Sequence, residues 1–197
     1  MGNIEILDGL KSKDKKKRYK ARDEIMKLSR SMKRKQKAEL LNTLNEKSVS
    51  PDWEERYISM YGISRYMWRN GRFDDLGRTY ANVLRLIEDD DGRVRAAARN
   101  ALEHFRSFFT TFVYGSYNHF DEKKVVRLWL ESLFLLWDRT KSMEEGKKQY
   151  HLIRCVDTLF RPDMEGYLTN KEYKKYREIW DKLQELDELY NEFGFEE

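Results

Sequence analysis

The sequence predicts an all-α fold, an α-α superhelix of stacked helical hairpins closed by a C-terminal capping helix. Three observations lead to this prediction. A residue pattern returns three times, opened by aspartates that are 38 and 39 residues apart. The 197 residues include only two prolines and ten glycines, so little interrupts long helices. Apolar residues recur at helical spacing through most of the chain. A fixed internal period of this length is typical of helical repeat arrays.

Each copy of the pattern begins with an aspartate and places an arginine four residues later. These residues are Asp14, Arg18, Asp52, Arg56, Asp91 and Arg95. A small residue, a branched aliphatic residue and a large apolar residue follow in each copy: Ala21, Ile25 and Leu28, then Ser59, Ile63 and Tyr66, then Ala98, Leu102 and Phe105. Aspartate is a favourable cap for the start of a helix. An acid and a base four residues apart suit an ion pair on one helix face. We therefore expect a helix after each aspartate, with its small residue at a tight contact.

The intervening segments complete the hairpins. We expect helical hairpins at about 1–28, 33–66 and 73–105, with Asn70-Gly71 as a turn between the second and third. Residues 108–117 are aromatic and β-branched, and we interpret them as a helix end followed by a buried loop. A fourth, degenerate hairpin is expected at 121–160, where Gln149 stands in place of the repeat arginine.

A clear start signal precedes the last helix, expected at 170–192. Thr169 with Glu172 three residues later forms a capping box. Tyr173, Tyr176, Trp180 and Leu183 follow as one apolar stripe. A repeat array exposes apolar surface at its end, and a helix with a single apolar stripe can cover that surface. We therefore expect this helix to cap the array. The whole chain is thus expected to be one α-solenoid domain, 1–197.

Residues 87–105 carry a family resemblance. An acidic turn precedes Val94-Arg95, and spaced alanines and Leu102 follow. This segment resembles the second helix of a HEAT repeat. The likeness is weaker at 51–66 and weakest at 13–28, where Lys17 replaces the valine. The resemblance implies that acids and bases of neighbouring repeats pair in a structural ladder, and that the chain is a non-enzymatic scaffold mediating protein–protein interaction.

Residues with catalytic potential are few and have structural interpretations. His104, His119 and His151 lack the spacing of a metal site. Cys155 lies on the apolar side of a helix and is expected in the core. Trp129, Trp137 and Asp138 invite comparison with HEAT-like DNA glycosylases, but their apolar neighbours favour core packing. We therefore expect no enzyme activity, no metal and no cofactor, with a glycosylase-like enzyme as the least favoured alternative.

Charge is distributed unevenly along the chain. Residues 1–50 hold 15 lysines and arginines against 7 acids, whereas the last 17 residues hold one lysine and seven acids. The candidate binding residues for phosphate or an acidic partner are Lys13, Lys15, Lys16, Lys17, Lys20, Arg22, Arg34 and Lys35. A protein partner is the favoured interpretation. A nucleic-acid-binding solenoid with a basic N-terminal face is the alternative, through counterion release, and a merely solubilising surface also fits.

The expected location is the cytoplasm. No secretory segment follows Met1, and the most apolar stretch, 125–137, is interrupted by Arg127 and Glu131. A single cysteine excludes an internal disulfide. The sequence does not identify the partner.

Overall fold

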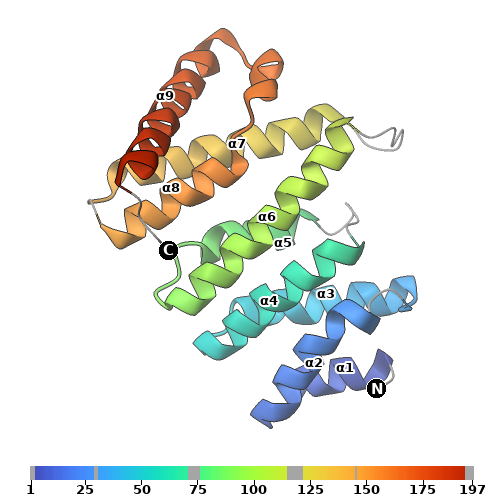
Figure 1. The fold of residues 1–197 in the computed structure, drawn as a ribbon. Coiled ribbons are helices and arrows are strands. Elements are labelled where there is room, and N and C mark those ends of the chain that lie inside the picture. The colour runs from blue at the N-terminus through green and yellow to red at the C-terminus, as the bar shows by residue number, and fades with distance from the viewer. Residues whose placement is uncertain (1–2, 29–30, 71–75, 115–121, 145, 194–197) are drawn as a thin grey trace. The chain divides into compact units, whose positions relative to one another are not determined.

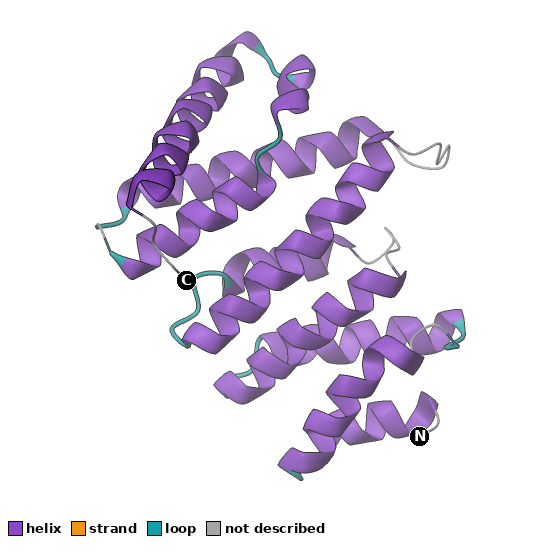
Figure 2. Ribbon diagram, viewed as in Figure 1, coloured by secondary structure: helices purple, strands orange, loops and turns teal. Residues whose placement is uncertain are grey.

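The computed structural model describes residues 3–28, 31–70, 76–114, 122–144 and 146–193, and within these ranges every regular element is a helix (Figures 1 and 2). The helices are α1 (Asn3–Lys11), α2 (Lys15–Leu28), α3 (Arg34–Ser48), α4 (Trp53–Asn70), α5 (Leu76–Leu86), α6 (Gly92–Tyr114), α7 (Glu122–Ser142), α8 (Lys147–Leu159) and α9 (Asn170–Phe193), with a 3-10 helix at Pro162–Tyr167. The all-α prediction is confirmed for these residues. Gly71 of the predicted turn and residues 115–117 of the predicted loop lie outside the described residues.

The chain divides into two compact units, Met1–Thr111 and Phe112–Glu197, and the division falls within α6. In the first unit, consecutive helices pair as the hairpins α1/α2, α3/α4 and α5/α6 (Figure 1). The first helices of the hairpins form one layer, in which α1 contacts α3 and α3 contacts α5. The second helices form the other layer, with α4 between α2 and α6 (Figure 1).

The predicted pattern residues form the core between these layers. Ala21, Ser59 and Ala98 are fully buried, and so are the aliphatic residues that follow them: Ile25, Ile63 and Leu102. Tyr66 and Phe105 are buried as well. A repeat pattern therefore places equivalent side chains at equivalent depths in successive hairpins, as a stacked array requires.

Small residues permit the closest helix approaches in this unit. A Cβ atom added to Gly9 of α1 would lie 2.7 Å from the Cβ of Ala21 of α2. A Cβ atom added to Gly62 would lie 2.7 Å from Leu44 of α3 and 3.0 Å from Ile25 of α2. These distances are shorter than a carbon–carbon contact of about 3.5–4 Å. Gly62 is thus a packing residue at the meeting point of three helices.

A chain of hydrogen bonds, buried at Asn45 and Thr79, joins the first helices of the second and third hairpins. The Asn45 side-chain amide donates to the Thr79 hydroxyl at 2.9 Å, and the Asn82 amide donates to the Asn45 side-chain oxygen at 2.9 Å. Arg85 donates to the Ser48 carbonyl at 2.6 Å. Buried polar groups of this kind require their partners, so these bonds set how α3 and α5 align.

The second unit contains the degenerate hairpin α7/α8 and the long helix α9. Leu152, Val156 and Leu159 of α8 are buried at the positions that the repeat predicts. Gln149, at the arginine position, donates to the Met143 carbonyl at 3.4 Å. Helix α8 begins at Lys147, directly after Gly146, which has a φ of 157°.

Helix α9 begins at the predicted capping box. The Thr169 backbone N–H donates to Glu172 at 2.9 Å, and the Glu172 N–H donates to the Thr169 hydroxyl at 3.4 Å. Tyr176 and Leu183 are buried as expected, but Tyr173 is 44% exposed and Ile179 takes part in the stripe instead. The stripe is displaced because α9 packs through Tyr176 and Trp180 on Phe160, whereas the Tyr173 hydroxyl bonds to Glu165.

Candidate protein-binding face

The aspartates and arginines of the repeat make the same contacts three times. The carboxylates of Asp14, Asp52 and Asp91 accept the backbone N–H two residues ahead, at 2.8 to 2.9 Å. Each arginine folds its Nη1 back onto two carbonyls of the preceding loop. Those carbonyls belong to Ser12 and Lys13 for Arg18, to Ser50 and Pro51 for Arg56, and to Asp89 and Asp90 for Arg95. The motif thus closes each loop onto the helix that follows it.

Two of these arginines also contact an acid of the next hairpin. Nη2 of Arg18 lies 2.6 Å from Glu54, and the guanidinium of Arg56 holds Asp89 through two hydrogen bonds, of 2.6 and 3.0 Å. The acceptors are therefore residues near the capping aspartates rather than the aspartates themselves. Sequence spacing gave no sign of Glu54 and Asp89, since both depend on how neighbouring hairpins stack.

Glu54 and Asp91 are held ionised by their partners. Lys15 at 2.5 Å, together with Arg18, lowers the pKa of Glu54. Arg93 and two backbone N–H groups lower the pKa of Asp91 to about 2. The charged side chains in this part of the molecule thus pair with one another. They form a structural network rather than an open ligand site.

A cluster of tyrosines and arginines covers the layer of second helices. Tyr19 and Arg22 come from α2, and Tyr57, Tyr61 and Arg65 from α4. The Arg22 guanidinium carbon lies 4.5 Å from the ring centre of Tyr19 and 4.3 Å from that of Tyr61. The Arg65 guanidinium carbon lies 5.0 Å from the Tyr61 centre and its Nη2 donates to the Tyr61 hydroxyl at 2.7 Å. Cation–π contacts of this kind hold both arginine side chains in place.

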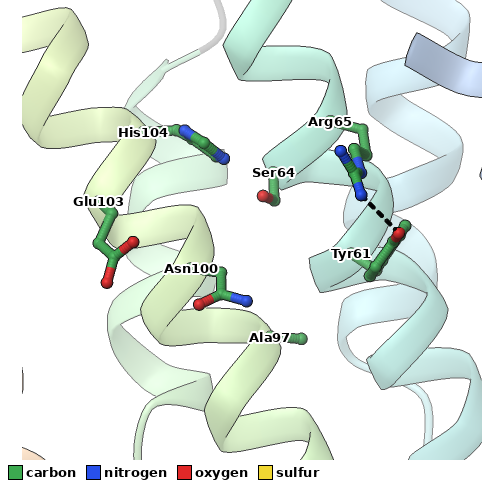
Figure 3. Close-up of a pocket in the computed structure, with 7 residues that line it drawn as sticks. All are labelled: Tyr61, Ser64, Arg65, Ala97, Asn100, Glu103 and His104. Carbon is green, nitrogen blue, oxygen red and sulfur yellow. Dashed lines mark hydrogen bonds between the residues drawn. The ribbon is translucent and has the colours of Figure 1, made fainter.

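A pocket of about 280 Å³ lies beside this cluster, between α4 and α6 (Figure 3). Its lining residues are Tyr61, Ser64, Arg65, Ala97, Asn100, Glu103 and His104. Ala97 is buried and small, which leaves space between the two helices. Figure 3 shows the Asn100 amide and the His104 ring directed towards α4, and one hydrogen bond among the seven residues, from Arg65 to Tyr61. The lining is polar and offers hydrogen-bond donors and acceptors from two hairpins.

Burial holds His104 neutral near pH 7. The half-buried environment lowers the pKa of this imidazole, and the positive charge of Arg65 lowers it further, whereas Glu103 acts in the opposite direction. A neutral imidazole offers one donor and one acceptor nitrogen. The sequence analysis assigned His104 no site, because the three histidines lack the spacing of metal ligands. In the described ranges no cluster of metal-binding side chains forms.

The predicted basic residues do not gather in one place. Lys13, Lys16, Lys17 and Lys20 are exposed near the start of α2. Arg34 and Lys35 are exposed at the start of α3, beyond the other end of α2. The fourteen residues of α2 span roughly 20 Å at 1.5 Å per residue. Lys15 and Arg22 are engaged with Glu54 and with the tyrosine cluster.

The candidate residues of the second unit have packing roles. Trp129 is buried and donates to the Leu159 carbonyl at 2.7 Å, and Trp137 donates to Glu178 at 3.3 Å. Asp138 is an exposed partner of Lys175. Cys155 is buried. His119 lies outside the described residues. None of the described helices is long and apolar enough to cross a membrane.

Comparison with known proteins gives a likeness to solved structures at low identity. No family model and no curated protein matches the chain. One engineered protein aligns with a TM-score of 0.41 and 12% identity over 85% of this chain, which spans half of that protein's length. A second engineered protein aligns at 0.41 and 12%, over 78% of this chain and 77% of its own. A designed armadillo repeat protein in complex with the peptide (KR)4 aligns at 0.39 and 14%, over 91% and 90%.

Proposed function

We propose that this chain is a non-enzymatic, HEAT-like scaffold that binds a protein partner on the face formed by α2, α4 and α6. One observation carries the proposal: the tyrosine–arginine cluster and the polar pocket adjoin on one face, across three consecutive hairpins. Tyrosine and arginine are the residues most enriched among those that dominate binding energy at protein interfaces. Because their side chains are already held by mutual contacts, ordering them on binding costs little entropy.

The pocket offers polar groups from two hairpins. Ser64 and Arg65 line it from α4, and Asn100 and His104 line it from α6 (Figure 3). We interpret this lining as a recognition surface for polar groups.

The test is co-purification from the cells that make the protein, with quantitative mass spectrometry. Asn100→Glu places a charge in the pocket. Asn42→Glu is the matched control, because Asn42 is an equally exposed asparagine in the layer of first helices, on α3. We expect the wild type and Asn42→Glu to retain the same protein partner and Asn100→Glu to lose it. A partner retained by all three proteins would contradict the proposed face.

A nucleic-acid scaffold is the second candidate, because Lys16, Lys17 and Lys20 are exposed at the start of α2. Replacing Lys16 and Lys17 with glutamate should then abolish a gel shift on duplex DNA or RNA. The wild-type affinity should fall steeply between low and physiological salt, since phosphate binding releases counterions. If the wild type shifts neither duplex at low salt, this candidate fails.

A further inference from the structure

Arg65 differs from four other arginines of the layer of second helices in the partners that it has. Arg18, Arg22, Arg56 and Arg93 each lie within 2.7 Å of a carboxylate oxygen. Arg65 instead donates to the Tyr61 hydroxyl and, at 3.7 Å, to the Met26 sulfur. In the described part of the chain no carboxylate lies within ion-pair distance of it. Its positive charge therefore stays uncompensated by contact, although its side chain is only partly exposed.

Contacts fix this charge at the edge of the pocket. The bond to Tyr61 and the cation–π contact restrain the guanidinium on α4. A guanidinium has five N–H donors, and the two bonds to Tyr61 and Met26 leave others for a ligand. Across the pocket, Asn100 adds an amide donor and His104 an imidazole nitrogen (Figure 3). Glu103 lies at the outer edge of α6, across the pocket from Arg65 (Figure 3). The site thus combines one cation and neutral hydrogen-bonding groups with the carboxylate of Glu103 at its outer edge.

This arrangement suits a single carboxylate. Arginine binds carboxylates through paired N–H donors, and such charge-assisted bonds are roughly twice as strong as neutral ones. A phosphate ester carries up to two negative charges, and the single charge of the Arg65 guanidinium balances it poorly. Nucleic-acid bases would need free aromatic faces for stacking. Arg22 covers Tyr19, Tyr57 and Tyr61 at 4.3 to 5.6 Å from their ring centres.

We propose that the pocket between α4 and α6 receives an aspartate or glutamate side chain of the protein partner, with Arg65 as the residue that pairs with its carboxylate. The tyrosine–arginine cluster then contacts the residues that flank this acid in the partner segment. This inference rests on the proposed function and names the chemistry of its partner. It assigns recognition of acidic groups to the pocket between α4 and α6, whereas the candidate residues from the sequence are Lys13, Lys15, Lys16, Lys17, Lys20, Arg22, Arg34 and Lys35.

An NMR titration tests the proposal with a defined probe. The probe is a decapeptide of alternating glutamate and serine, and its glutamine analogue serves as the uncharged control. We expect the glutamate peptide to shift the amide resonances of Ser64, Arg65, Ala97 and Asn100, and to bind at least about tenfold more tightly than the glutamine peptide. Shifts confined to residues 13–20 would overturn the proposal, because they would assign the affinity to the basic start of α2.

Variants of two arginines separate pairing from general charge. Arg65→Gln should abolish the preference for the glutamate peptide over the glutamine peptide. Arg65→Lys should retain only part of this preference, because lysine lacks the paired N–H donors of the planar guanidinium. Arg78→Gln is the matched control, because Arg78 is an exposed arginine on α5, in the other layer. It should keep the full preference. A preference that survives Arg65→Gln, in a variant whose circular dichroism and melting temperature match the wild type, would overturn the proposal.

The two proposals fail in different ways. If the glutamate peptide does not bind while Asn100→Glu still loses its co-purified protein, the binding face stands and the acidic chemistry is wrong. If Asn100→Glu keeps every partner, the face itself is wrong. A duplex DNA that displaces the peptide from the pocket would also overturn the assignment to an acidic protein segment.

Discussion

Two alanines of α6 show how depth decides the effect of a substitution. Ala98 is fully buried against neighbouring helices, whereas Ala96, two residues away, is exposed. We predict that Ala98→Leu lowers the free energy of unfolding by about 1–3 kcal/mol, because the added atoms must displace packed neighbours. Ala96→Leu should change it by less than about 0.5 kcal/mol. Urea denaturation of both variants checks this, and equal losses would contradict the repeat assignment.

Glu172 provides a residue-scale prediction with a pH dependence. Arg127 at 2.6 Å and the Thr169 bonds lower the pKa of Glu172 from about 4.5 to about 2. A carboxyl whose pKa is lowered by folding contributes stability above the unfolded pKa and loses it as pH falls through the folded pKa. Glu172→Gln should therefore be less stable than the wild type by about 0.5–1 kcal/mol at pH 7, a magnitude typical of a partly exposed pair.

The difference between these two proteins should shrink between pH 4.5 and pH 2, when measured by chemical denaturation across that range. Glu185→Gln is the control, because Glu185 is 62% exposed and pairs only with Lys182 of its own helix among the described residues. It should stay close to the wild type at every pH. A Glu172→Gln deficit that is constant from pH 7 to pH 2 would show that packing, not charge, is the cause.

At the residue scale, the sequence predicted the residues that cap helices, but it did not predict the contacts between hairpins. The capping role of Asp91 and the capping box of Thr169 depend on neighbours within four residues, and both are confirmed. Arg65 and His104 belong to one pocket although they are 39 positions apart. Nothing in the sequence around either residue shows that these two helix faces meet, so the pocket was not predictable from the amino-acid sequence.

At the scale of elements, the Arg56–Asp89 pair links the second hairpin to the third. The pair is largely buried, with side chains 16% and 6% exposed, and its two parallel bonds need the planar fork of arginine. We predict that Arg56→Lys lowers the free energy of unfolding by about 1–2 kcal/mol. A double-mutant cycle with Asp89→Asn should give a coupling energy above about 0.5 kcal/mol. Additive losses would mean that the two side chains act independently.

Helix positions were predictable because apolar periodicity is strong in most segments, and their ends were less so. The sequence predicted a helix end and a loop over residues 108–117, but helix α6 continues to Tyr114. It does so although β-branched and aromatic residues fill this stretch. Tertiary context overrides such weak local preferences. Helix α9 shows the same limit, since Tyr173 shares the helical spacing of the stripe but is 44% exposed.

At the scale of the whole molecule, the single solenoid domain remains a prediction, and the capping role of α9 can be tested within its own unit. Helix α9 is joined to α7 by Arg127–Glu172, Lys175–Asp138 and the Trp137–Glu178 bond. Its Tyr176 and Trp180 rings lie 4.7 and 5.4 Å from that of Phe160, which is 6% exposed. Removing α9 would therefore uncover aromatic surface that has no other cover among these contacts.

We predict that deleting residues 169–197 gives a protein that associates and melts at a lower temperature, because exposed apolar patches promote association. Deleting only 194–197 leaves α9 whole and should change neither property. Light scattering and thermal denaturation of the two truncated proteins provide the measurement. The contrary outcome is a 1–168 protein that stays monomeric with an unchanged melting temperature but no longer binds the proposed protein partner. In that case the stripe of α9 would itself be a binding surface, and its role as a cap would be wrong.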